Sequence, residues 1–174
     1  DQDPNNPDNL ILIYQRTSVS GTWDSGATWN REHVWPQSLM DVDTNNSSRH
    51  EGSDLHNLAP ADSGENSSRS NKYYGELTTS STYAPHDDVK GDVARALFYM
   101  DVMYDHLTLV DGAPSVHEMG DLSLLIDWAE MDTVNQFEQN RNDVIYSYQS
   151  NRNPLIDLPH LMELIYFDHP SLVN

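Results

Sequence analysis

Two stretches of the sequence combine residue types that could carry out hydrolysis. Glu32 and His33 are adjacent within residues 29–36, and a polar stretch beginning at Asp54 reaches Asn66. A carboxylate can bind a hard cation through oxygen, whereas an imidazole accepts a proton near neutral pH. The two stretches together predict one metal-assisted hydrolytic site.

The elements that must position these residues are predicted from periodicity. Apolar residues recur every three or four positions from Asp87 to Leu107, which indicates an amphipathic helix. Further helices are expected at residues 121–130, 133–148 and 160–166. In the helix expected at residues 133–148, four residues are predicted to face inward: Val134, Phe137, Val144 and Tyr148. Pro154 and Pro159 are expected to stop helices.

Strands are expected to be few. Residues 10–14 have the length and branching of a buried strand, whereas residues 17–29 read as a loop or irregular hairpin leading to Glu32. Residues 1–9 and 38–53 are predicted to be exposed loops, and a cation bound by residues 1–9 is a weaker alternative. The predicted fold class is α+β with helices dominant, in a single domain spanning residues 1–174.

Composition limits the partners and the chemistry. The chain has 28 acidic residues against nine Lys and Arg, giving a formal charge of −19, which by itself argues against binding nucleic acid. Because there is no cysteine, disulfides, thiolate zinc sites and cysteine nucleophiles are excluded. No apolar run could span a bilayer, so no membrane partner is expected, and the chain opens without an export signal.

Several ordered blocks resemble the endonuclease I family of secreted non-specific nucleases, which belongs to the His-Me finger group. The resemblance covers nearly the whole chain and is carried by residues 29–38, 54–60, 66–71, 91–100 and 141–157. It implies a ββα-metal finger embedded among additional helices. It also implies hydrolysis of phosphodiester bonds in DNA, and probably RNA as well, without sequence specificity, leaving 5′-phosphates.

By the same resemblance, His33 matches the general base, and Glu32 and Asn66 match the metal ligands. One charged and one neutral oxygen ligand leave room for water, which suits Mg²⁺, with Mn²⁺ or Ca²⁺ able to occupy the same site. A bound cation would also supply positive charge at the phosphate, and salt would screen the acidic surface. The acidic surface thus suggests adaptation to salt. The resemblance implies a secreted, bacterial-type protein, extracellular or periplasmic, whose export signal is absent from this chain. We expect the protein to be monomeric.

The supporting residues are less closely specified by the resemblance. The phosphate-binding arginine of the family has three candidates in this chain, of which Arg49 is favoured over Arg69 and Arg31. Arg69 is otherwise expected to be a structural anchor or a second phosphate contact. Two further residues, His56 and Asn57, either orient the base or, as we favour, brace the loop, and Asn151 lies in a polar turn that could line the cleft.

Alternative interpretations of the sequence remain open. Trp23, Trp29 and Trp35 could stack on bases, although packing at the rim of the finger is favoured. One rival function is a site-specific endonuclease of the same finger, but the chain has no basic reading module. The other is an acidic secreted cation-binding module without catalysis, using residues 1–9 and 41–54.

Overall fold

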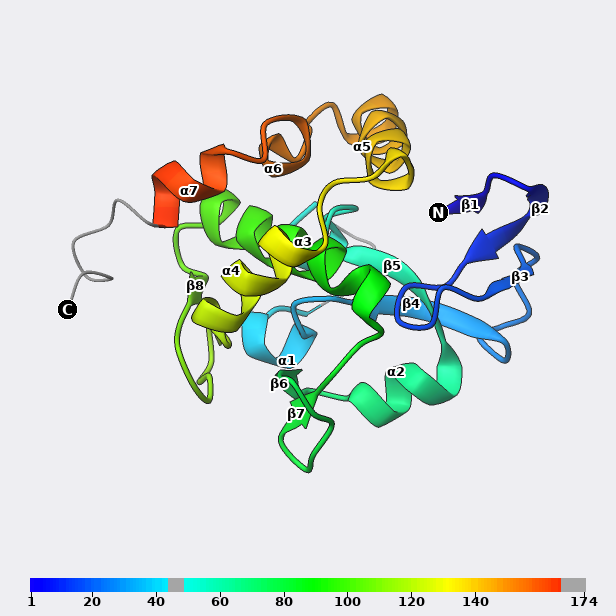
Figure 1. Cartoon of the computed structure of the whole chain (residues 1–174). Coiled ribbons are helices and arrows are strands. Elements are labelled where there is room, and N and C mark those ends of the chain that lie inside the picture. The colour runs from blue at the N-terminus through cyan, green and yellow to red at the C-terminus, as the bar shows by residue number, and fades with distance from the viewer. Residues whose placement is uncertain (44–48, 167–174) are drawn as a thin grey trace.

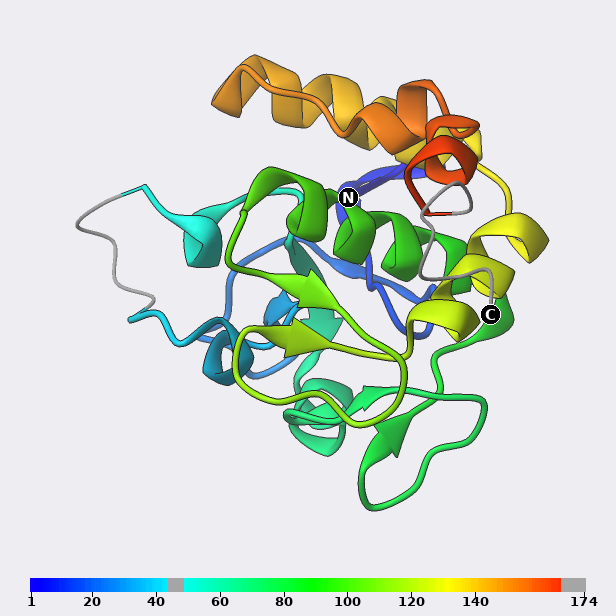
Figure 2. The ribbon, with the colours of Figure 1, turned by 90° about the vertical axis from the view of Figure 1, so that its left-hand side faces the viewer.

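Helix α3 (Lys90–Met103) is the central element of the computed structural model, which describes residues 1–43 and 49–166 (Figure 1). Helix α5 (Gln136–Gln149) lies above α3 and helix α2 (Ser63–Arg69) below it in both ribbon views (Figure 1, Figure 2). The inner face of α3 is fully buried and forms the middle of the hydrophobic core: Val93, Ala94, Leu97, Phe98 and Met100. The helix predicted from Asp87 onward is thereby confirmed.

Two strands and a helix carry both predicted stretches, and residues 34–57 connect the two strands. Strand β4 (Trp29–His33) pairs antiparallel with β5 (Leu58–Asp62), with Glu32 opposite Ala59 and His33 opposite Leu58. Helix α2 follows β5 directly and begins at an N-cap, Asp62, whose carboxylate accepts two backbone N–H groups. Helix α2 packs against both strands, so residues from 29–33 and 63–69 meet at one place.

The remaining elements are short. The N-terminal sheet has the order β1-β2-β3, and two parallel two-stranded pairs, β6-β7 and β8-β9, follow α2 in the chain. The strands are β1 (Gln2–Asp3), β2 (Asn6–Ile11), β3 (Ser18–Ser20), β6 (Tyr73–Tyr74), β7 (Thr82–Tyr83), β8 (Thr108–Leu109) and β9 (Glu118–Met119). The other helices are α1 (Gln37–Met40), α4 (Leu122–Met131), α6 (Pro154–Asp157) and α7 (Leu161–Tyr166), with 3₁₀ turns at Glu51–Ser53 and Asp87–Val89. The chain is thus α+β, as predicted.

Residues 1–9 are largely exposed, as their composition predicts, but they are not a loop. Much of this segment is strand, because β2 pairs with β1 on one edge and with β3, through Leu10 and Val19, on the other. Asp3 is buried and accepts hydrogen bonds from the Asn5 backbone N–H (2.8 Å) and the Ser18 hydroxyl (2.5 Å). These hydrogen bonds replace the contacts with water that the sequence alone suggested for the Asp3 carboxylate. The segment 17–29 likewise contains a true strand, β3.

The inward face of α5 is largely polar, with Glu138 and Asn142 buried beside Ile145, and two of the four predicted inward residues are wrong. Val144 and Tyr148 are 53% and 77% exposed, whereas Glu138 and Asn142 are buried. Glu138 forms a bidentate ion pair with Arg95 of α3, at 2.6 and 2.7 Å. Because a buried carboxylate with an arginine partner can replace an apolar contact, apolar periodicity misses this face.

The structure also differs in part from the predictions for Pro154 and for the loop at residues 38–53. Pro154 begins α6 at its first position, after the Asn153 cap, instead of ending a helix. The helices predicted at 121–130 and 160–166 are confirmed by α4 and α7. The predicted loop 38–53 has helical turns at both ends, and its residues 44–48 lie outside the described part.

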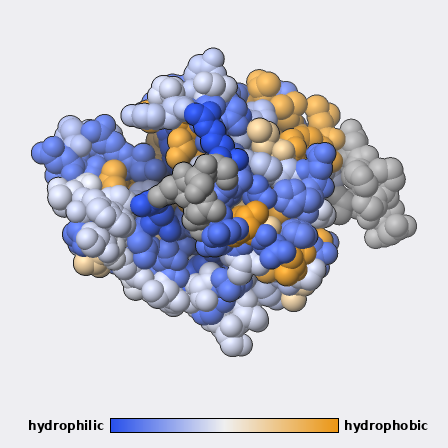
Figure 3. Space-filling view, turned by 180° about the vertical axis from the view of Figure 1, so that it is seen from behind, coloured by the Kyte–Doolittle hydropathy of each residue, from blue (hydrophilic) through white to orange (hydrophobic). Residues whose placement is uncertain are grey.

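The surface is mainly hydrophilic, as the acidic composition predicts. Hydrophilic residues dominate the face seen in Figure 3, and hydrophobic residues gather on the side of α7, where Leu164 and Ile165 are exposed. No helix within the described residues is long and apolar enough to cross a membrane.

Candidate active site

His33 is held as a neutral imidazole with one nitrogen free. It is the last residue of β4 and is half-buried, with its Nε2 atom 2.9 Å from the carbonyl oxygen of Gly52. Because a carbonyl oxygen can only accept, Nε2 must carry the hydrogen, which leaves Nδ1 as the basic atom. Burial, together with the charges of Arg69 and Arg31, lowers the pKa of His33 below its usual value. The imidazole can therefore accept a proton at neutral pH.

Glu32 points to the opposite side of β4 and is almost fully buried, at 3% exposure. Its Oε1 atom accepts hydrogen bonds from the Tyr14 hydroxyl (2.6 Å) and from Arg69 (2.9 Å). Burial raises the pKa of the Glu32 carboxyl, while Arg69 and the Tyr14 hydroxyl favour its charged form. Both bonds use the same oxygen, and within residues 1–43 and 49–166 no side chain donates to Oε2.

Asn66 lies on α2 beside the same face of β4 as Glu32. Its Nδ2 donates to the side-chain oxygen of Asn30 at 2.6 Å, and Asn30 precedes Glu32 by two residues on that face. Asn66 and Arg69 are three residues apart and share one side of α2, so α2 faces Asn30 and Glu32 with this pair. The Asn66 Oδ1 atom has no hydrogen-bond partner in the described part of the chain.

The Glu32 carboxylate and the Asn66 side-chain oxygen suit one hard divalent cation. They supply one charged and one neutral ligand, and water or phosphate oxygens would complete the coordination of an ion such as Mg²⁺. Among the residues whose placement is described, no group of three or more His, Asp or Glu side chains is arranged to hold a metal. A histidine-rich zinc-type site is therefore not what these residues offer.

Arg69 is an internal anchor. It is 1% exposed and binds Glu32, while its other hydrogen bonds go to the carbonyl oxygens of His33 (3.0 Å) and Val34 (2.6 Å). Its guanidinium also lies over the ring of Tyr74, with Cζ 4.9 Å from the centroid. Of the two roles that the sequence left open for Arg69, structural anchor and second phosphate contact, this placement corresponds to the anchor.

Three of the cations have no carboxylate partner among the described residues. Of the nine Lys and Arg residues, six form ion pairs: Arg16, Arg69, Lys90, Arg95, Arg141 and Arg152. The other three are Arg31, Arg49 and Lys72. Arg31 precedes His33 by two residues, exposed Arg49 precedes Gly52 by three, and Lys72 follows α2. Positive charge that a phosphate could use is thus concentrated in the segments that build the site.

Asn57, His56 and Asn151 contact structural neighbours instead of His33. The Asn57 side chain accepts from the Trp35 backbone N–H (2.7 Å) and donates to its carbonyl (3.2 Å). The His56 ring packs on Tyr99 with centroids 4.4 Å apart, and Asn151 donates to the Tyr99 hydroxyl at 2.6 Å. These contacts favour bracing for all three residues.

Sequence reasoning missed the group that holds the Gly52 turn. Asp54 is buried, and its Oδ2 accepts from the hydroxyls of Tyr99 and Tyr104, both at 2.8 Å. Its Oδ1 accepts from Gln149 (2.8 Å) and from its own segment, the backbone N–H of residue 56 (2.9 Å). Asp54 therefore ties the turn that carries Gly52 to α3 and to the end of α5. Its side-chain donors lie 45 to 95 residues away in sequence, so no local pattern indicates them.

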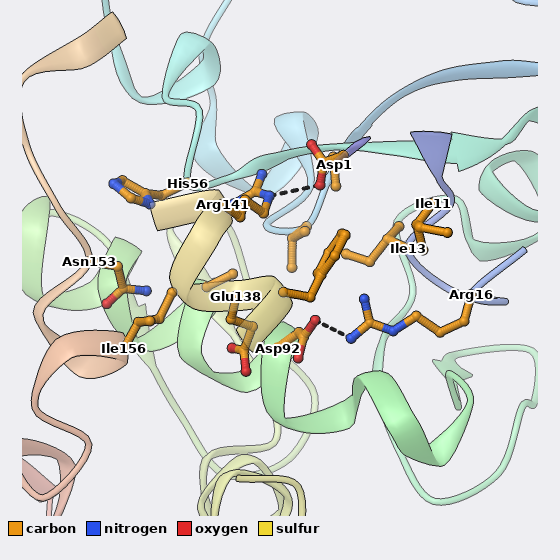
Figure 4. A pocket seen from close by; sticks show the side chains of 14 residues that line it. Asp1, Ile11, Ile13, Arg16, His56, Asp92, Glu138, Arg141, Asn153 and Ile156 are labelled. Atoms are coloured by element: carbon orange, nitrogen blue, oxygen red, sulfur yellow. Dashed lines mark hydrogen bonds and ion pairs between the residues drawn. The ribbon is translucent and has the colours of Figure 1, made fainter. Parts of the chain in front are cut away.

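A small cavity lies elsewhere, between α5, α3 and the N-terminal strands (Figure 4). Its volume is about 40 Å³, far below the few hundred Å³ of a typical ligand pocket. Ion pairs of Arg141 with Asp1 and of Arg16 with Asp92 border it, and His56 reaches it from the other end (Figure 4). Its lining includes neither His33 nor Glu32, so it is separate from the candidate site.

β4 and α2 thus combine an imidazole with a fixed tautomer on one face of the strand with a carboxylate and an amide on the other, and these are residue types that metal-assisted hydrolases use. The chain belongs to the endonuclease I family, whose model matches residues 2–84 and 78–160. It is 42% identical, over 95% of its length, to an extracellular ribonuclease of Bacillus subtilis (strain 168). It is 40% identical over the same share to an extracellular ribonuclease of Bacillus amyloliquefaciens. The matched region is 64% of the length of each of these relatives. The family predicted from the sequence blocks is confirmed.

Proposed function

We propose that this chain is a metal-dependent, sequence-non-specific endonuclease that hydrolyses phosphodiester bonds in DNA and RNA. The observation that carries the proposal is the 2.9 Å contact between His33 Nε2 and the Gly52 carbonyl, which leaves Nδ1 free as a base. Membership of the endonuclease I family and the likeness to two extracellular ribonucleases support the substrate class and a secreted location.

His33 acts as the general base in this mechanism. Its Nδ1 takes a proton from a water molecule, and the resulting hydroxide attacks phosphorus in line with the 3′-oxygen. The bond from phosphorus to the 3′-oxygen breaks, and the 3′-oxygen takes up a proton from solvent water, which leaves a 5′-phosphate and a 3′-hydroxyl. Because the nucleophile comes from water, no 2′-hydroxyl is needed, so DNA and RNA are both substrates.

The unit β4–β5–α2 serves as the ββα-metal finger. Glu32 and Asn66 would hold the cation, which we take to be Mg²⁺, with Mn²⁺ or Ca²⁺ able to bind in its place. When bound, the cation supplies electrostatic stabilisation of the anionic transition state and of the leaving oxygen. Arg69 positions Glu32 by binding one of its carboxylate oxygens.

Arg49 is the proposed phosphate contact. It is exposed and has no ion pair with the described residues, whereas Arg69 is buried and bound to Glu32 and to two backbone carbonyls. Together with Arg31, it provides local attraction for phosphate on a chain whose formal charge is −19. The bound cation and these two arginines thus offset the repulsion between the acidic chain and a nucleic acid. The rest of the surface, which is acidic, suits activity in salt.

The proposal is tested by nicking of supercoiled plasmid and cleavage of a structured RNA, with Mg²⁺ and with EDTA. We expect both substrates to be cut with Mg²⁺ and neither with EDTA. Asn66→Ala is expected to raise the Mg²⁺ concentration needed for half-maximal rate roughly 10- to 100-fold. Asn71→Ala is the matched control, because Asn71 is an exposed asparagine two residues beyond α2, and it should leave the titration unchanged.

Two results would overturn the proposal in different ways. Cleavage that persists in EDTA would exclude a required cation. A protein that binds Mg²⁺ in calorimetry but cuts neither substrate would favour the cation-binding module without catalysis.

A further inference from the structure

Trp23, Trp29 and Arg31 form an exposed aromatic and cationic cluster, which we call the Trp23 platform. The two indole rings meet edge to face, with centroids 5.0 Å apart, and Arg31 Cζ lies 5.7 Å from the centroid of the Trp23 ring. Trp23 is 50% exposed, in contrast to the fully buried Trp35 and Trp128. A large aromatic ring is therefore offered to solvent on a predominantly hydrophilic molecule.

The platform is continuous with the candidate active site through β4. Trp29, Arg31 and His33 alternate along this strand, so their side chains leave it on the same side. Trp29 and His33 are four positions apart in the strand, which corresponds to a distance of about 13 Å. One nucleic-acid strand crossing the site could therefore contact both.

The turn that presents Trp23 is held in place before any ligand binds. The Asp24 carboxylate accepts from the Ala27 backbone N–H (2.9 Å) and from the Thr28 backbone N–H (3.0 Å) and hydroxyl (2.6 Å). Gly26 has a φ of 84°, a conformation that favours glycine, and its carbonyl accepts from the Ser63 hydroxyl of α2 (2.5 Å). An ordered turn reduces the entropic cost of binding a ligand on the ring.

The alternative interpretation, in which the tryptophans only pack at the rim of the finger, fits Trp29 better than it fits Trp23 and its neighbour Arg31. Trp29 is half-buried, but Trp23 keeps half of its surface exposed, and Arg31 has no carboxylate partner among residues 1–43 and 49–166. On a chain with 28 acidic residues, an exposed arginine without such a partner is complementary to a phosphate. An exposed indole beside it is complementary to the face of a base.

We propose that the Trp23 platform binds an unpaired base of a single-stranded nucleic acid, with Arg31 contacting an adjacent phosphate. The inference rests on the proposed function, which places the scissile phosphate at His33, and it puts the bound base a few nucleotides away. A base stacked inside a duplex does not expose its face, so the platform favours single strands over duplexes.

Binding in EDTA tests this site without requiring cleavage. Fluorescence anisotropy would measure the affinity of the whole chain for a short fluorescein-labelled oligodeoxythymidylate and for a mixed-sequence duplex of equal length. We expect Trp23→Ala to weaken binding of the single strand roughly 10- to 100-fold, and binding of the duplex less than about twofold. Trp23→Phe should retain most of the affinity, because it keeps an aromatic face.

Tyr148→Ala is the matched control, since Tyr148 is an exposed aromatic residue (77%) at the end of α5, outside the platform. It should leave binding of both ligands unchanged. The inference is overturned if Trp23→Ala binds the single strand as tightly as the parent, or if both ligands weaken equally. A parent chain that shows the expected binding pattern but cuts nothing with Mg²⁺ would overturn the proposed activity and leave the platform standing.

Discussion

The carbonyl oxygen of Gly52 lies 2.9 Å from Nε2 of His33 and thereby fixes which ring nitrogen of His33 is basic. This contact joins two stretches of sequence that are 19 residues apart. It holds only while the Glu51–Ser53 turn stays in place, and the buried carboxylate of Asp54 next to that turn receives four hydrogen bonds. Positioning of the base thus depends on residues that never meet the substrate.

Removing this support should lower the catalytic rate without weakening substrate binding. Asp54→Ala leaves the hydroxyls of Tyr99 and Tyr104 without their acceptor and releases the turn that carries Gly52. We expect kcat to fall roughly 10- to 100-fold with KM little changed. Steady-state cleavage of a labelled RNA measures both constants, and Tyr104→Phe, which removes one of the four bonds, should give a smaller loss. An Asp54→Ala protein that folds and keeps the parental kcat would disprove the positioning role.

The buried pair of Arg69 and Glu32 should matter strongly for stability. Arg69→Met leaves the buried Glu32 carboxylate without its cationic partner and removes one donor each from the His33 and Val34 carbonyls, which should lower the free energy of unfolding by about 3–5 kcal/mol. Urea unfolding followed by circular dichroism measures this loss. Arg152→Met is the control, because Arg152 pairs with Asp157 and Asp143 at the surface, and such pairs contribute about 1 kcal/mol or less. Equal losses in the two variants would contradict the anchoring role.

His56 should make the protein less stable in mild acid. Burial lowers the pKa of this 2%-exposed imidazole from 6.5 to about 4, against the opposing charge of Asp54 and in the same direction as that of Arg141. Above pH 6.5, His56 is neutral in both the folded and the unfolded chain, so it contributes no pH dependence. Below that pH, only the unfolded chain gains the proton, so the free energy of unfolding falls by roughly 3 kcal/mol as the pH drops toward about 4.

The contribution of His56 is isolated by comparing the parent with His56→Gln. The free energy of unfolding of each, from urea titrations between about pH 7 and about pH 4, gives a difference in slope to which other titrating groups contribute equally. A shallower slope in His56→Gln is the expected result. Parallel curves would show that His56 is not responsible.

Much of the fold and the family assignment could be predicted because both depend on local sequence. The three-to-four-residue spacing of Val93 and Leu97 specifies α3, and the ordered blocks at residues 29–38 and 54–60 carry the family resemblance. What could not be predicted depends on partners distant in the chain. The pairing of Glu138 with Arg95 turns the polar face of α5 inward, and Asp54 finds its donors on α3 and α5.

The roles of the arginines show the same limit. Sequence alone left Arg31, Arg49 and Arg69 as alternatives for the phosphate, because an arginine's burial depends on what surrounds it. Packing separates them, since Arg69 is enclosed by Tyr74 and the end of β4 while Arg31 and Arg49 are exposed.

The central claim, that His33 is the general base, is tested most directly by the rate at which His33→Ala cleaves supercoiled plasmid with saturating Mg²⁺. Loss of a general base should lower kcat roughly 10²- to 10⁴-fold. His86→Ala, which alters a histidine whose side chain is 60% exposed, serves as the control and should keep the parental rate. A folded His33→Ala protein that cuts plasmid as fast as the parent would contradict the mechanism.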